Sequence, residues 1–151
     1  MNSTIALTLP ANYTYVLLVA ASSTLVSAWH TIAVMKYRKR SKIPYPNTYA
    51  SHEQAEKSID AYQFNCAQRA HHNFLEIYPE FLTQLAIAGL TFPELSAGLG
   101  AVYLVARVIY ATGYTRPVRD GGRGRYNGII QYVPRAGLAG LSLASVYKLI
   151  F

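Results

Sequence analysis

The sequence has little charge and almost no cysteine. Only 14% of its 151 residues are charged, whereas soluble domains average about 25%. Cys66 is the single cysteine, which excludes an intrachain disulfide framework and a cysteine-rich metal site. No internal repeat or low-complexity tract is visible, so we expect a single domain over 1–151. Hydrophobic residues are abundant instead, at 52% of the chain, and their distribution indicates the class of protein.

Long apolar runs predict an all-α membrane protein. A helix needs about 20 apolar residues to cross roughly 30 Å of hydrocarbon. The run from Tyr13 to Met35 carries no formal charge and is followed at once by basic residues, which is typical of a span or signal anchor. Three more runs follow, separated by breaks such as Phe92-Pro93 and the glycine-rich stretch 120–124. We therefore predict a bundle of four transmembrane helices, at roughly 13–37, 60–91, 95–115 and 127–150.

Basic residues concentrate in two of the predicted connections. The first connection contains KYRKRSK, and the third contains Arg116, Arg119, Arg123 and Arg125. The positive-inside tendency places both in the cytosol and both termini in the lumen. The net charge of +7 then faces anionic membrane lipid, and we predict no nucleic-acid binding, because the basic residues adjoin apolar runs. Asn2 and Asn12 begin sequons on the luminal side; we predict glycosylation at neither, since such triplets occur by chance and Asn12 is close to the membrane.

The second predicted helix carries a polar stripe of Arg69, Asn73, Glu76 and Glu80. The spacing of four, three and four residues places these side chains on one face of a helix. Ionisable groups in a span usually face protein or water and often mark function. Arginine binds a carboxylate bidentately and glutamate can hold an ammonium group, so the stripe fits a zwitterionic ligand. An alternative fits the spacing equally well: these residues pair with one another and hold the helices together.

The third predicted helix carries a second stripe of Tyr103, Arg107, Tyr110 and Tyr114. Tyrosines near a helix end commonly form an interfacial belt, and that reading applies most directly to Tyr114. Arg107 lies deeper in the span and needs a partner, for which we expect Glu76 or Glu80 on the second helix.

The chain's own thiol and its adjacent histidines are not expected to be reactive. Cys66 lies outside the polar stripe, about 60° from Arg69 on the helical wheel, so we expect it to be inert packing. If a thiolate is used, we expect it on the substrate, where a loop arginine would favour it, because a nearby guanidinium lowers a thiol pKa from about 8.5. His71 and His72 point to different faces of the helix, and no carboxylate–histidine pair has metal spacing, so we predict no metal site.

Three segments resemble the MAPEG superfamily, the membrane-associated proteins of eicosanoid and glutathione metabolism. FNCAQRAHHNFLEIYPEFL, residues 64–82, is similar to the second-helix signature of the type 3 microsomal glutathione S-transferase branch. GLGAVYLVARVIYATGY, residues 98–114, and YRKRSKIPYP, residues 37–46, extend the likeness over nearly the whole chain. The resemblance implies a homotrimer of four-helix subunits that bind glutathione at subunit interfaces.

The resemblance also implies the residues of the site. Glutathione would be bound by residues of helices two and three and, across the interface, by the end of helix one: Arg69, His71, Asn73, Glu76, Tyr110, Tyr114 and Arg38. His71 stands where relatives carry a glutamine, and Ile77 stands where they carry a tyrosine, so one contact is lost or replaced. Tyr110 is also expected to be catalytic, together with a thiol-activating arginine after Gly113-Tyr114. Arg123 is the first choice for that arginine, and Arg119 and Arg125 are the alternatives.

The function implied by the resemblance is glutathione chemistry on a hydrophobic partner. The enzyme would add the glutathione thiolate to a hydrophobic electrophile, reduce a lipid hydroperoxide, or do both. The expected location is the endoplasmic reticulum membrane, with the outer mitochondrial membrane as the alternative. The competing hypothesis is a non-catalytic fatty-acid-binding scaffold of the same superfamily. A transport role ranks last, because transporters usually have more spans and internal repeats.

Overall fold

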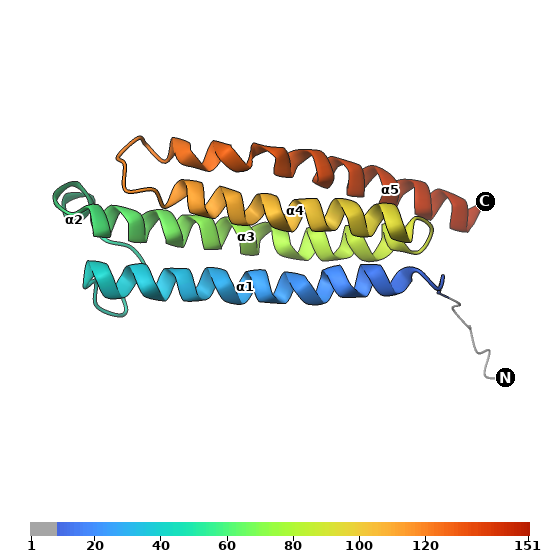
Figure 1. The fold of residues 1–151 in the computed structure, drawn as a ribbon, viewed down its shortest axis with the longest axis horizontal. Coiled ribbons are helices and arrows are strands. Elements are labelled where there is room, and N and C mark those ends of the chain that lie inside the picture. Colours follow the sequence, from blue (N-terminus) through green and yellow to red (C-terminus); the bar gives the residue numbers. More distant parts are fainter. Residues whose placement is uncertain (1–8) are drawn as a thin grey trace.

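The computed structural model describes residues 9–151, which fold into helices and connecting loops. The elements are α1 (Tyr13–Ser41), α2 (His52–Lys57), α3 (Ile59–Gly89), α4 (Pro93–Tyr114), the 3-10 helix η1 (Arg123–Gln131) and α5 (Tyr132–Ile150). The long helices α1, α3, α4 and α5 lie alongside one another in an elongated bundle (Figure 1). The predicted all-α class is therefore confirmed. Asn2 lies outside the described residues.

Local sequence signals account for several of the helix ends. The Ser58 hydroxyl accepts a hydrogen bond from the Ala61 amide at 3.4 Å and so caps the start of α3. Pro93 stands in the first turn of α4, where a missing N–H breaks no helical bond. α1 continues to Ser41, beyond the predicted end at 37, and is followed by Lys42 with a φ of 56°.

The bundle has an apolar interior and an apolar exterior. A core of Val16, Val19, Phe81, Leu85 and Leu138 lies between the helices. Many other large hydrophobic side chains point outward, and Leu25 and Leu143 expose 71% and 74% of their surface. Apolar patches of this extent are rare on soluble monomers. Within the described residues, two helices, α1 and α4, are long and apolar enough to cross a membrane.

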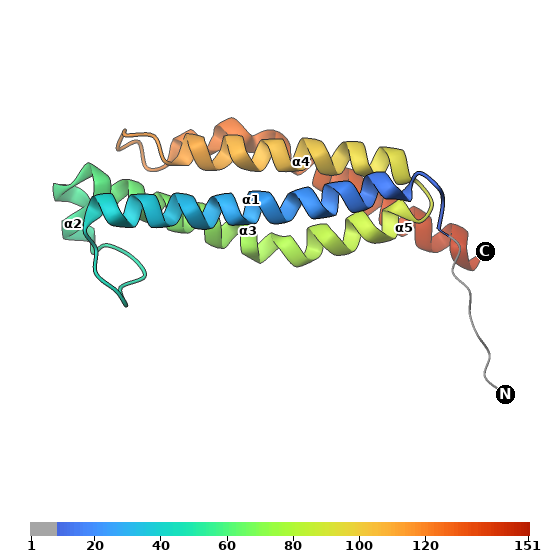
Figure 2. The ribbon, with the colours of Figure 1, turned by 60° about the horizontal axis from the view of Figure 1, so that its bottom comes forward.

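Both basic segments lie at one end of the bundle. The end of α1, with its last-turn residues Arg38, Lys39 and Arg40, lies at the same end as the connection from α4 to η1, and α2 lies there too (Figures 1 and 2). The α3–α4 turn and the C-terminus lie at the opposite end (Figure 1). The antiparallel helices thus separate a basic end from an end that carries the short Thr91–Phe92 turn.

The last predicted helix is divided in two. The range 127–150 was expected to be one α-helix, but the α-helix begins only at Tyr132, after the 3-10 helix η1. In this segment Gly113 of α4 and Gly124 of η1 approach closely, and a Cβ atom on either residue would overlap the carbonyl oxygen of the other. Gly128 also packs closely against α4, since an added Cβ would lie 2.6 Å from the Tyr110 Cβ. The chain therefore runs directly along α4 before it turns into α5.

Candidate functional site

The polar stripe of α3 faces outward at the basic half of the bundle. Arg69 and Glu76 are exposed, and Asn73 between them is half-buried. Neither Arg69 nor Glu76 takes part in an ion pair within the described part of the chain. The mutual Arg69–Asn73–Glu76 network, which the spacing allowed as an alternative, is therefore absent from these residues. A guanidinium and a carboxylate remain available on one face of one helix.

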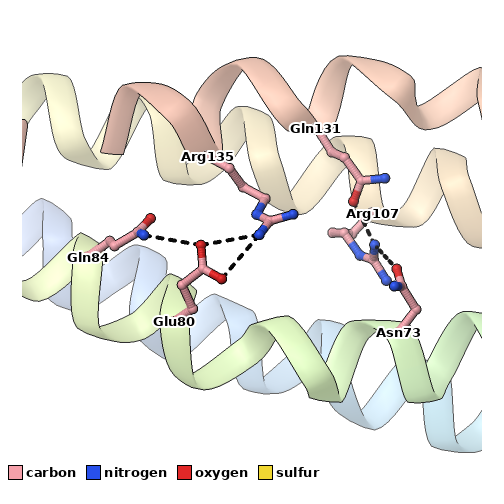
Figure 3. Close-up of polar contacts among 6 residues, drawn as sticks. All are labelled: Asn73, Glu80, Gln84, Arg107, Gln131 and Arg135. Atoms are coloured by element: carbon pink, nitrogen blue, oxygen red, sulfur yellow. Dashed lines mark hydrogen bonds and ion pairs between the residues drawn. The ribbon is translucent and has the colours of Figure 1, made fainter. Parts of the chain in front are cut away.

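Arg107 lies behind Asn73 and is fully buried, with 0% of its surface exposed. Its Nη1 donates to the Asn73 Oδ1 at 2.9 Å and to the Gln131 Oε1 at 2.6 Å (Figure 3). Its Nη2 donates to the Ala70 carbonyl at 3.3 Å. The prediction that Glu76 or Glu80 is the partner of Arg107 is therefore wrong. The helix register places an amide from α3 and another from η1 around the guanidinium, so Arg107 is a buried cation with neutral partners.

Arg107 contacts two groups of the candidate site, the Asn73 amide and the Tyr110 ring. Because the Asn73 oxygen accepts from Arg107, the Asn73 amide nitrogen is the group left to donate to a ligand. The Arg107 guanidinium also lies 4.7 Å from the centre of the Tyr110 ring, within cation–π range. The Tyr110 and Tyr114 rings meet edge to face at 5.7 Å. α3 and α4 thus bring Asn73, Tyr110 and Tyr114 together through Arg107.

The arginines of the loop after α4 contact different parts of the protein. The Asp120 carboxylate accepts from the backbone amides of Arg123 and Gly124 at 3.1 and 3.2 Å, which turns the chain into η1. Arg125 donates to the Gly121 and Gly122 carbonyls at 3.1 and 2.9 Å, and its guanidinium lies 5.5 Å from the centre of the Tyr114 ring.

The other two loop arginines point elsewhere. The Arg123 side chain is exposed, and Arg119 donates to the Ala55 carbonyl of α2 at 3.3 Å. Among the described contacts, Arg125 is the loop arginine that reaches the tyrosines.

Two predicted ligand residues face other parts of the subunit. His71 stacks on the buried His30 of α1, with ring centres 5.9 Å apart. Arg38 donates to the Asn47 carbonyl at 2.8 Å and lies 4.3 Å from the centre of the Tyr45 ring. Both side chains therefore contact α1 or its following loop, and no described contact joins them to Tyr110 or Tyr114.

A cavity of about 270 Å³ adjoins the stripe at the basic end of α3. Its lining includes Arg69, Tyr114 and Gly122. Cys66 also contributes to the lining, but only 5% of its surface is exposed. The cavity therefore offers a guanidinium and a phenol rather than an accessible thiol. Within the described residues, no group of three or more histidine, cysteine or carboxylate side chains is arranged to hold a metal ion.

Comparison with known proteins identifies the family. The chain matches the MAPEG family over residues 16–144. It belongs to the MAPEG family. It is 33% identical to the leukotriene C4 synthase of Bos taurus over 97 residues, which are 64% of this chain and 58% of that protein. It is 33% identical to the leukotriene C4 synthase of Cavia porcellus over 93 residues, which are 61% of this chain and 55% of that protein. The matched region thus spans less than two thirds of the length of these relatives.

Membership of the MAPEG family confirms the resemblance seen in the sequence motifs. MAPEG proteins are membrane proteins, and the apolar exterior of the bundle is consistent with that setting. In that setting the buried Arg107 lies within a helix that is apolar enough to span the bilayer. A charge in such a position is unfavourable unless polar groups bind it, and such charges often mark function. Here Arg107 binds Asn73 of α3 and contacts Tyr110 of α4.

The sequence analysis did not predict the roles of two side chains of this MAPEG protein. Gln131 binds the buried Arg107, and Arg135 pairs with Glu80 at 3.1 Å. A signal for both was present, because they are four residues apart in an otherwise apolar segment and so lie on one helical face. The sequence did not indicate which element that face would contact.

Proposed function

We propose that this MAPEG protein is a glutathione-dependent membrane enzyme that conjugates glutathione to a hydrophobic electrophile, reduces lipid hydroperoxides, or does both. The observation that carries the proposal is a guanidinium and a carboxylate that form no ion pair within the described part of the chain. They lie beside an oriented amide and two tyrosines. Glutathione carries carboxylates and an ammonium group, so its charges match those of the guanidinium and the carboxylate. The matched relatives are named leukotriene C4 synthases, and the motifs resemble the type 3 microsomal glutathione S-transferase branch.

Each residue has a distinct task in the proposed reaction. Arg69 binds a glutathione carboxylate, Glu76 binds the ammonium group, and the Asn73 amide nitrogen donates to the peptide. A loop arginine near Tyr114 stabilises the thiolate, because a guanidinium favours the deprotonated thiol. Tyr110 positions the sulfur or donates its proton to the oxygen that develops charge.

The glutathione thiolate can react with either type of co-substrate. In conjugation, the thiolate forms a C–S bond, and the displaced oxygen of an epoxide takes up a proton. In peroxide reduction, the thiolate attacks the terminal oxygen of the hydroperoxide and gives a lipid alcohol and a glutathione sulfenic acid. A second glutathione then converts the sulfenic acid to the disulfide and water.

The proposal extends to the assembly and its place in the cell. We propose a homotrimer of subunits in which α1, α3, α4 and α5 all cross the bilayer, since α3 and α5 lie alongside the two apolar helices. Arg38, at the end of α1, would serve the glutathione of a neighbouring subunit, and His71 would contact the tripeptide in the position of the relatives' glutamine. The proposed location is the endoplasmic reticulum membrane, with the outer mitochondrial membrane as the alternative.

The decisive experiment is an activity assay on the protein purified in detergent. With glutathione, the wild type should turn over an epoxide or a hydroperoxide. Arg69→Gln and Glu76→Gln should each raise the KM for glutathione by about tenfold, because each removes a charge-assisted hydrogen bond. Glu53→Gln in α2 is the matched control and should leave KM unchanged, because Glu53 pairs with Lys57 at the exposed surface.

The alternative function has its own distinct outcome. Absence of turnover with either class of co-substrate would refute the enzymatic proposal. If glutathione titration also detected no binding, the result would favour the fatty-acid-binding scaffold.

A further inference from the structure

A second charged pair lies deeper along the same stripe of α3. Arg135 Nη2 donates to both carboxylate oxygens of Glu80 at 3.2 and 3.1 Å, and Gln84 Nε2 donates to Glu80 Oε1 at 3.1 Å (Figure 3). Glu80 follows Glu76 by four residues, which is about 6 Å along the helix. The pair therefore continues the candidate glutathione face toward the middle of the bundle.

This pair is open to the surroundings of the subunit. Glu80 exposes 47% of its side chain and Arg135 exposes 22%. The neighbouring surface of α5 is apolar, and Tyr132 and Val133 expose 58% and 63% of their surface. A charged pair facing hydrocarbon is strongly unfavourable. A polar group must therefore cover the pair when the protein is in a membrane.

The unused hydrogen-bonding capacity indicates the chemistry of that group. Arg135 uses only Nη2 for Glu80, and within the described residues its Nη1 makes no hydrogen bond and is not among the buried unpartnered atoms. The pair has no net charge, so it does not attract a free anion. A carboxylate on the ligand would be repelled by the carboxylate of Glu80. A hydroxyl group both donates and accepts, and so it can bond to Glu80 and to Arg135 at once.

We propose that the Glu80–Arg135 pair binds a hydroxyl group on the hydrophobic co-substrate, so that the preferred co-substrate is a hydroxylated long-chain molecule. This inference rests on the proposed glutathione chemistry. Glu80 lies seven residues beyond Asn73 on α3, or about 10 Å along the helix axis. Asn73 and Tyr110 both contact Arg107, so with the sulfur beside Tyr110, as proposed above, the hydroxyl group is bound about 10 Å from the reacting atom along the helix axis. The apolar chain between them lies along α3 and α5.

The test compares two matched co-substrates of a type that the wild type turns over. One ends in a methyl group, and the other carries a hydroxyl group about 10 Å from the reacting atom. The wild type should show a kcat/KM about tenfold higher for the hydroxyl form, the effect expected of one hydrogen bond to a charged group. Glu80→Leu combined with Arg135→Leu should abolish this preference, and it leaves no single charge behind in the membrane.

Controls separate recognition of the hydroxyl group from general damage. Glu53→Leu combined with Lys57→Leu removes an ion pair from α2, where both side chains are about three-quarters exposed (76% and 75%), and should keep the preference. If the leucine variant does not fold, Glu80→Gln combined with Arg135→Gln keeps the polar volume without charge and should weaken the preference. Retention of an unreactive long-chain alcohol over the alkane, measured by native mass spectrometry, reports binding without turnover.

Several results would overturn the inference. One is a wild type that does not distinguish hydroxyl from methyl, and another is a wild type that prefers a carboxylate at the same position. A third is a leucine variant that loses both activities equally while its subunits dissociate, which would make the pair a subunit contact. Absence of any turnover would refute the enzymatic proposal alone, because native mass spectrometry would still decide whether the pair binds the alcohol.

Discussion

Arg107 shows how one buried residue can set the properties of an exposed site. Its guanidinium has neutral partners in Asn73 and Gln131 and touches the Tyr110 ring. The bond to Asn73 fixes which end of that amide points outward. A buried cation without a carboxylate partner also favours negative charge nearby, which suits a site that is proposed to hold a thiolate.

Asn73→Asp separates the structural effect of this contact from its effect on ligand binding. Aspartate would pair with the buried Arg107, so the melting temperature should stay equal or rise. The variant loses the outward amide donor and places a carboxylate there, so glutathione affinity should fall by about tenfold. Thermal unfolding and glutathione titration measure the two effects. An unchanged affinity would show that the Asn73 amide nitrogen does not contact the ligand.

The three loop arginines should differ in their effect on the reaction rate. Because Arg125 lies over Tyr114, Arg125→Gln should lower the rate at neutral pH by about tenfold and move the pH–rate profile upward, as a thiol that has lost its guanidinium ionises about one pH unit higher. Arg119→Gln and Arg123→Gln should have smaller effects. A larger loss in Arg123→Gln would restore the first choice made from the sequence.

At the scale of elements, the contact between α4 and η1 determines where the loop arginines lie. Gly124→Val should lower the free energy of unfolding by about 2 kcal/mol, because its side chain would collide with the Gly113 backbone. Gly98→Ala, also a glycine substitution but with no atom within 4 Å of the added Cβ, should be neutral or slightly stabilising. Thermal unfolding in detergent measures both variants. Equal stability of the two would contradict the close approach.

At the scale of the whole molecule, the bundle predicts which segments share a side of the membrane. In a Cys66→Ser background, Tyr45→Cys and Val118→Cys should react from one side of sealed vesicles, because the first loop and the α4–η1 connection share an end (Figure 1). Glu94→Cys and Phe151→Cys should react from the other side. An impermeant maleimide measures accessibility. Labelling of Val118→Cys and Phe151→Cys from the same side would exclude a spanning α5.

The helical class, the family and the faces of the helices could all be predicted from the order of the residues. Helical periodicity is a local property, so the spacing of Arg69, Asn73 and Glu76 was enough to place them on one side of α3. The motifs around these residues were enough to indicate glutathione chemistry as a hypothesis. The low charge and the long apolar runs were enough to indicate a membrane protein.

The contacts between side chains of different elements could not be predicted in this way, because they depend on how the helices pack. The partner of Arg107 depends on the register between α3, α4 and η1, and the spacing within one helix carries no information on that register. The sequence therefore suggested a carboxylate for Arg107, whereas the fold supplied Asn73 and Gln131 and paired Glu80 with Arg135. Likewise, the Gly113–Gly124 approach joins two consecutive elements across their loop, and in that arrangement Arg125 rather than Arg123 lies beside Tyr114.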